Sequence, residues 1–125
     1  MKISIDTQEI YSLIKIDEEK IDSRNASDLK HQFVMMNGAG VKSFILDLSQ
    51  TKYVDSSGLS AILVGNRLAN NAGGNLVLTG LQSHVLKMLE ISQLLSVLYI
   101  TETNEEAIEA LFLAEMEDEE EEEHH

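Results

Sequence analysis

The sequence predicts one α/β domain, in which a mixed and partly parallel sheet of about five strands is covered by about four helices. Three observations lead to this fold class. The chain has 125 residues, the usual size of a single domain. Residues 3–5 and 10–16 read as two strands joined by a polar turn at 6–9. From residue 20 onward, short apolar runs alternate with segments of helical periodicity, which favours parallel strands with helices packed on them.

The next part of the chain predicts a helix followed by a central strand. Asp22 and Ser23 are good N-cap residues for the helix, and Gly38 and Gly40 are expected to end it. Within it, apolar residues recur at helical spacing: Ala26, Leu29, Phe33 and Met36. Residues 44–48 read F-I-L-D-L, and four apolar side chains in five are typical of a strand that is buried on both faces.

The second half predicts a helix over 59–72, which Gly73-Gly74 closes. Thr103 to Glu106 form a capping box, in which the threonine accepts a hydrogen bond from the third amide and Glu106 reaches back. This box opens a last helix with apolar residues at Ala107, Ile108, Leu111 and Phe112. The elements expected in between are a strand at 76–78, a short helix at 85–89 and a strand at 97–100.

The negative charge of the chain is concentrated at its end. The net charge is −13, but eight of the 22 acidic residues lie in residues 115–123. Without these eight, fourteen acidic residues face nine basic ones, a net charge of −5. Because like charges at this density repel and stay solvated, residues 115–125 are expected to form a disordered tail after a domain over residues 1–114. The final His124 and His125 resemble the remnant of a purification tag.

Composition excludes several classes of function. The chain has no cysteine, so it holds no disulfide or thiolate metal site, and this fits a reducing, cytoplasmic location. No apolar run is long enough for a signal peptide or a membrane span, so direct insertion into a membrane is not expected. The mildly acidic domain lacks a basic surface for direct binding of nucleic acid.

The sequence lacks the residue spacing of common catalytic and ligand-binding motifs. His31 and His84 are isolated in the sequence, so no metal site is expected. A serine hydrolase elbow, G-x-S-x-G, is missing, because Val54 and Asp55 precede Ser56. The segment 38–43, G-A-G-V-K-S, is no phosphate loop, since valine separates glycine from lysine and the segment precedes a strand.

The segment 54–62, V-D-S-S-G-L-S-A-I, stands where an apolar run meets the helix predicted at 59–72. Asp and Ser are preferred N-cap residues, so helix capping accounts for one of them. Three such residues followed by a glycine are more than a cap requires. The same position attracts anions, because free amides and the positive end of the helix dipole point at it. From these residues alone, a structural cap and a switchable phosphate on Ser56 both remain open.

The segment 44–59, F-I-L-D-L-S-Q-T-K-Y-V-D-S-S-G-L, resembles the central strand, loop and switch of STAS domains of the bacterial anti-sigma factor antagonist type. Ile21-Asp22 with Ala26 and Leu29 resembles the first-helix motif of that family, and the segments 71–81 and 85–95 resemble its later helix, strand and helix. The similarity covers residues 3–113. It departs from the family at Glu19 and Gln93, where glycine is common.

The resemblance implies a phosphorylation switch. The unphosphorylated domain would bind a serine kinase that is also an anti-sigma factor, and this would free the sigma factor. The kinase would phosphorylate Ser56, or alternatively Ser57, and a phosphoserine phosphatase would reverse the modification. Asp55 would shape the site, Ser57 assist or cap the helix, and Gly58 let the kinase approach the backbone. Asp22 is expected to line the same surface, and the protein would have no catalysis or cofactor of its own.

Two other functions stay open. The same fold serves as a scaffold or regulatory subunit of a stress-signalling or transporter complex. Alternatively, the serine pair could belong to a small nucleotide-binding protein or enzyme. Turnover of ATP or GTP, or tight binding of either by the pure protein, would favour this last function over the switch.

Overall fold

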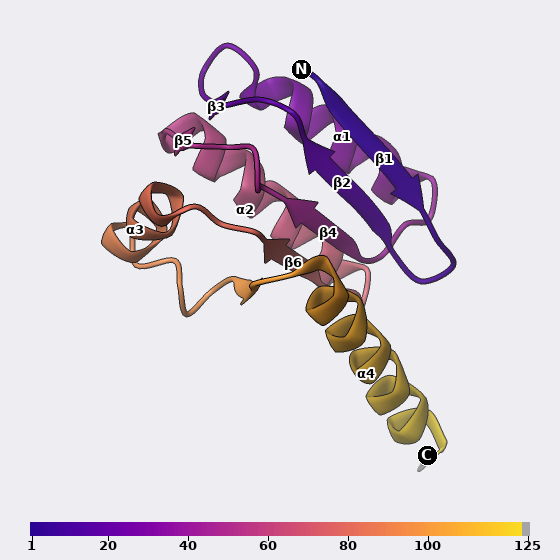
Figure 1. Ribbon diagram of the computed structural model, residues 1–125. Helices are drawn as coiled ribbons and strands as arrows, with labels where there is room; N and C mark the ends of the chain where they lie inside the picture. The colour runs from indigo at the N-terminus through magenta and orange to yellow at the C-terminus, as the bar shows by residue number, and fades with distance from the viewer. Residues whose placement is uncertain (124–125) are drawn as a thin grey trace.

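A computed structural model describes residues 1–123, and a five-stranded sheet forms its centre (Figure 1). The first two strands pair antiparallel, and all the other neighbours pair parallel. This confirms the predicted mixed sheet. From one edge to the other the strands are β1 (Ile3–Thr7), β2 (Ser12–Ile16), β4 (Phe44–Asp47), β6 (Leu76–Thr79) and β7 (Tyr99–Thr101).

Four helices cover the two faces of this sheet: α1 (Ala26–Gly38), α2 (Ser56–Asn71), α3 (Ser83–Ile91) and α4 (Asn104–Glu123). The helices α1, α2 and α3 contribute to one apolar core, and α4 packs against the opposite face. In Figure 1, α4 leaves the sheet and points away from the rest of the molecule. The predicted number and order of helices are therefore confirmed.

Strand β4 divides the core, as its apolar sequence predicts. Phe44 and Leu46 lie in the core under α1 and α2, whereas Ile45 lies in the second core with Ala107 and Leu111 of α4. All five side chains are at most 4% exposed. Burial of each large apolar side chain stabilises the fold by about 1.5–3 kcal/mol, so both layers hold this strand in place.

A second, two-stranded sheet was not expected from the sequence. It pairs β3 (Lys20–Ile21) with β5 (Tyr53–Val54) in parallel. The backbone amides of Lys52 and Tyr53 both donate to the carbonyl of Glu19, at 2.8 and 3.1 Å. Two-residue strands carry no periodic pattern, so sequence analysis cannot recognise them.

The predicted start of α1 is wrong by several residues. Asp22 and Ser23 do not cap the helix, which begins at Ala26 after Asn25. Instead, the Asp22 carboxylate accepts the backbone amide of Arg24 at 3.0 Å, and the Asp22 carbonyl accepts that of Ala26 at 2.8 Å. Asp22 therefore stabilises a turn ahead of the helix rather than the helix itself.

Other boundaries also differ from the sequence prediction. Strand β1 extends to Thr7, into the predicted turn at 6–9, and α3 spans Ser83–Ile91 rather than 85–89. Helix α2 begins at Ser56 rather than residue 59, because Asp55 provides the cap. Strand β2 begins at Ser12 rather than residue 10, because the Gln8 amide donates to the Tyr11 carbonyl and closes a turn. Strand β7 begins at residue 99, two residues late, because the amides of residues 97 and 98 donate to the carbonyl of residue 94.

The acidic end of the chain is helical as far as Glu123, so the expected disorder from residue 115 is wrong for residues 115–123. The predicted cap at Thr103 is present, since its hydroxyl oxygen accepts the Glu106 amide at 3.1 Å. Glu106 reaches back to the threonine hydroxyl, which donates to its carboxylate at 3.3 Å. Glutamate is a good helix former, and extension of an existing helix needs no new nucleation. These two effects outweigh the repulsion between the acidic side chains. His124 and His125 lie outside the described residues.

Candidate functional site

The start of α2 lies beside the loop that follows β3. In the parallel pair β3–β5, Ile21 is opposite Val54, and the amide of Asp55 donates to the Ile21 carbonyl at 3.1 Å. Because both strands end at the same edge, residues 22–25 and 55–58 leave the small sheet side by side. The sequence placed Asp22 near the serine pair through a resemblance, and this pairing supplies the geometry.

Asp55 is the N-cap of α2. Its carboxylate accepts the backbone amide of Gly58 at 3.0 Å, and its carbonyl accepts the amide of Leu59 at 2.9 Å. The residue is half-buried and in an extended conformation, as an N-cap requires. Thus the acid in the motif already has a structural task, and the two serines that follow do not perform it.

Ser56 and Ser57 are the first two residues of α2. The side chain of Ser56 is exposed, and that of Ser57 is partly buried. No hydrogen bond of either hydroxyl occurs within the described part of the chain. Ser56 therefore presents a free hydroxyl to solvent at the positive end of the helix dipole.

Gly58 is buried where α2 crosses the small sheet. A Cβ atom at this position would lie 2.6 Å from both the Ile21 carbonyl oxygen and a methyl group of Val54. The structure thus gives Gly58 a packing role, since only glycine lets the first turn of α2 approach β3 so closely. A role in letting a kinase approach the backbone stays a prediction.

Asp22 is held by its neighbour Arg24. The two side chains form an ion pair of 2.9 Å, in which Asp22 is 16% exposed and Arg24 is 78% exposed. Hydrogen bonds from the guanidinium and then from the backbone amide of Arg24 hold the pKa of Asp22 below its usual value. Asp22 is therefore held in its ionised form, paired with the guanidinium of Arg24, on the loop beside Asp55.

Sequence reasoning missed an aromatic pair next to the serines. Tyr53, two residues before Asp55, stacks on His84 of α3 with ring centroids 5.8 Å apart and an angle of 26° between planes. Both side chains are exposed. No local pattern could have revealed the pair, because 31 positions in the sequence separate the two residues. It adds α3 to the surface around the start of α2.

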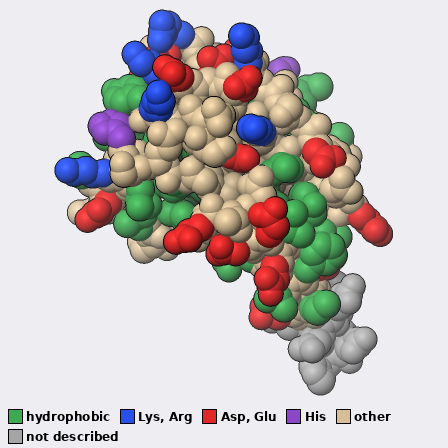
Figure 2. Space-filling model, viewed as in Figure 1, with side chains coloured by type: hydrophobic (Ala, Val, Ile, Leu, Met, Phe, Trp, Pro, Cys, Tyr) green, Lys and Arg blue, Asp and Glu red, His purple; other side chains and the backbone are tan. Residues whose placement is uncertain are grey.

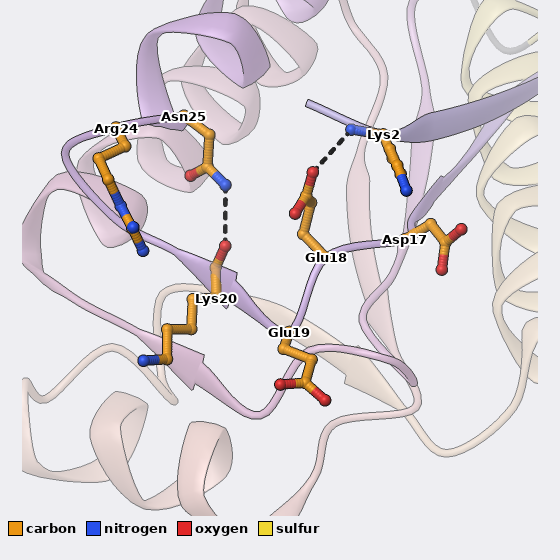
Figure 3. A pocket seen from close by; sticks show the side chains of 7 residues that line it. All are labelled: Lys2, Asp17, Glu18, Glu19, Lys20, Arg24 and Asn25. Carbon is orange, nitrogen blue, oxygen red and sulfur yellow. Dashed lines mark hydrogen bonds between the residues drawn. The ribbon is translucent and has the colours of Figure 1, made fainter.

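An open depression of about 610 Å³ lies beside β3 and the segment that leads into it (Figure 3). Its floor is tied together by two hydrogen bonds, from Asn25 to the Lys20 carbonyl at 2.8 Å and from the Lys2 amide to Glu18 at 2.9 Å. Three cationic and three acidic side chains line it, so its charge selects no single kind of ligand. The lining residues are Lys2, Asp17, Glu18, Glu19, Lys20, Arg24 and Asn25.

None of the helices in residues 1–123 combines the length and the apolar character needed to cross a membrane.

Comparison with known proteins places this arrangement in a family. The sequence model of the STAS domain matches residues 2–107. BtrV of Bordetella bronchiseptica, named as an anti-sigma factor antagonist, is 31% identical over 90 residues, which cover 72% of this chain and 78% of BtrV. The chain belongs to the STAS domain family, in its anti-sigma factor antagonist group. The predicted family is thereby confirmed.

Solved structures share the fold of this STAS domain. An anti-sigma factor antagonist of Thermotoga maritima has a TM-score of 0.78 at 21% identity, with 87% of this chain and 93% of that one covered. The phosphorylated form of SpoIIAA, a cell fate determinant of Bacillus, has a TM-score of 0.68 at 19% identity, with 87% and 98% covered. The STAS match ends at residue 107, within α4.

Proposed function

We propose that this STAS domain is an anti-sigma factor antagonist that a serine kinase inactivates by phosphorylating Ser56. The observation that carries the proposal is the exposed, free hydroxyl of Ser56 at the first position of α2, beside an Asp55 that is occupied as the cap. A kinase reaches this hydroxyl without unfolding the helix. Ser57, which is partly buried, is the alternative acceptor.

The unmodified surface around Ser56 is the one that binds the partner. It combines the start of α2 with Asp22 and with the exposed pair of Tyr53 and His84. The partner is a kinase that also acts as the anti-sigma factor, so its capture by the antagonist frees the sigma factor. Members of the family support this regulatory role.

Phosphorylation would disrupt binding through charge. A phosphate adds about −1.5 to −2 charges. The free amides at the start of α2 would hold these charges in place, with the carboxylate of Asp55 close beside them. In a docked interface the added charges would lose their water and meet no new cation, which costs several kcal/mol. The partner is released while the domain stays folded, and a phosphatase restores binding.

Relatives support the proposal by analogy. SpoIIAA has been solved in both an unphosphorylated and a phosphorylated form, and both share the fold of this chain. The partners inferred for this chain are accordingly a serine kinase and a phosphoserine phosphatase in the cytoplasm. A scaffold or regulatory subunit in a stress-signalling or transporter complex remains the second function that this fold serves. A sulfate transporter family protein of Wolinella succinogenes has a similar fold, with a TM-score of 0.67.

The proposal is tested by capture from a lysate of the source organism, with the tagged protein as bait and with or without ATP. We expect a serine kinase to bind without ATP and to leave when ATP is added, and mass spectrometry to find phosphate on Ser56. The Ser56→Ala variant should retain the kinase with ATP present. Phosphate on Ser57 alone would move the site, and capture of scaffold or transporter subunits without any kinase would favour the second function.

A further inference from the structure

The outer part of α4 carries an apolar stripe that nothing in the described chain covers. The helix packs on the sheet through Ala107 and Leu111, which are 0% and 4% exposed. On another side, Phe112, Leu113 and Met116 are 47%, 55% and 57% exposed. With about 100° between successive helical residues, these three cannot face the sheet together with Leu111.

The exposed stripe has the spacing of a helix that pairs with another helix. Glu109, Phe112, Leu113, Met116 and Glu117 recur at i, i+3, i+4, i+7 and i+8, and all five are exposed. We call these five residues the outer stripe. Its apolar centre is therefore bounded by a carboxylate at each end. Met and Phe within an acidic surround are well suited to bind amphipathic helices of opposite charge.

The charge of α4 selects the kind of partner. Residues 104–123 contain eleven acidic side chains and no basic one. In Figure 2, acidic and hydrophobic side chains line α4, whereas most Lys and Arg side chains gather at the other end of the molecule. Two copies paired through this helix would bring two strongly acidic segments together, and an anionic membrane would be repelled as well.

The electrostatics of the helix itself also favour a cationic partner. The C-terminal end of a helix carries a partial negative charge, and acidic residues there are destabilising. The last turn of α4 has no basic residue to offset this. A bound basic segment would relieve both the repulsion between the acidic side chains and their interaction with the dipole.

We infer that the outer stripe of α4 is a docking surface for a Lys/Arg-rich amphipathic helix of a partner protein. The surface is separate from Ser56, which lies at the start of α2 on the other side of the sheet from α4. It lies beyond the part of the chain that matches the STAS family. Binding at the outer stripe is therefore independent of phosphorylation.

The test uses the full chain and a synthetic Lys/Leu amphipathic peptide of about 14 residues, roughly four helical turns. Binding is measured by isothermal titration calorimetry. The variant Phe112→Ser/Leu113→Ser/Met116→Ser should weaken binding at least tenfold. The control is Val34→Ser/Met35→Ser on α1, whose side chains are 53% and 58% exposed; it should bind as the unaltered chain does. Urea denaturation confirms that both variants are folded.

Three results would overturn the inference. If the stripe variant and the control variant bound the peptide with equal affinity, the apolar side chains of the outer stripe would not contribute to binding. If a peptide with serine in place of leucine bound as tightly as the Lys/Leu peptide, charge alone would account for the interaction. Self-association of the unaltered chain in sedimentation, lost in the stripe variant, would make a second copy the occupant. Ser56→Asp should leave peptide binding unchanged, so failure of this inference and failure of the switch are distinguishable.

Discussion

The carboxylate of Asp55 accepts the backbone amide of Gly58 at 3.0 Å, and this hydrogen bond closes the first turn of α2 around Ser56. The acidic residue of the motif is thus a cap, and the serine that follows it remains free. The cap and the proposed phosphorylation site are therefore different, adjacent residues. Modification of Ser56 would leave the cap in place.

Replacement of Asp55 should show that it is a cap. Asp55→Ala removes the acceptor for the Gly58 amide, and we expect a loss of about 1 kcal/mol in the free energy of unfolding. Asp55→Ser keeps an N-cap oxygen and should lose little. Urea denaturation measures both. If the two variants were equally destabilised, the negative charge rather than the cap would be what matters.

Gly58 should not tolerate a side chain. Gly58→Ala places a methyl group 2.6 Å from the Ile21 carbonyl oxygen, so the backbone must shift at a cost of about 1–3 kcal/mol. Gly38→Ala is the matched control, because no atom lies within 4 Å of its Cβ position. That variant should be unchanged or more stable by up to about 1 kcal/mol. Equal stability of the two variants would contradict the close packing.

Gly65 should be coupled to Phe33 across the contact between α1 and α2. A Cβ atom at residue 65 would lie 2.6 Å from the ring of Phe33, which packs edge-on against Phe44 at 5.2 Å. We expect Gly65→Ala to cost about 1–3 kcal/mol. The smaller side chain of Phe33→Leu should relieve part of that cost in the double variant. Additive effects in a double-mutant cycle would argue against the contact.

Asp47 should stabilise the fold only while it is ionised. Burial pushes the pKa of Asp47 upward, but hydrogen bonds from Ser49 and Asn104 outweigh burial and hold the pKa below its usual value of 3.8. Its carboxylate accepts the Ser49 amide at 2.9 Å and the Asn104 side chain at 3.1 Å. The stabilisation is therefore complete above the unfolded-state pKa and is lost as pH falls through the lower folded-state pKa.

The free energy of unfolding of the Asp47→Asn variant, measured as a function of pH, tests this prediction. We expect a loss of about 1.5–3 kcal/mol at pH 7, the range for hydrogen bonds to charged groups. The gap in unfolding free energy between the variant and the unaltered chain should narrow as pH is lowered below the usual carboxyl range. Asp6→Asn, on exposed β1, is the control. A gap that widened in acid would mean that the folded-state pKa is raised.

The mixed sheet and its covering helices were accessible from the sequence because their residues repeat a simple pattern. Strand β4 has apolar side chains on both faces, and the helices that cover it have clear apolar stripes. The pairing of β3 with β5 was not accessible, since two residues carry no period. Consequently the approach of Asp22 to Asp55 depended on a family resemblance, and the stack of Tyr53 on His84 was missed.

The end of the chain shows a different limit. The composition of residues 115–123 shows the repulsion among their acidic side chains, but it does not show the stabilising effect of the helix that precedes them. A cap at Thr103 and the buried anchors Ala107 and Leu111 nucleate α4, and good helix formers then extend it. The serine pair is the converse case, since its position at a helix start was recognisable and only the assignment of the cap to Asp55 required the structure.

Ser56→Asp and Ser56→Ala should separate charge from the hydroxyl. The aspartate adds a negative charge at the start of α2 and should weaken binding to the captured kinase at least tenfold. The alanine should bind as the unaltered chain does and resist modification. Ser57→Ala is the control and should still accept phosphate. If Ser57→Ala lost the phosphate and Ser56→Ala kept it, Ser57 rather than Ser56 would be the phosphorylated residue.

The most direct measurement compares the affinity of the captured kinase for two samples of the unaltered chain, one phosphorylated and one not. Surface plasmon resonance with immobilised kinase, in the absence of ATP, gives both values. We predict that the phosphorylated chain binds at least tenfold more weakly, and that phosphatase treatment restores its affinity. Equal affinity of the two samples would contradict the proposed switch.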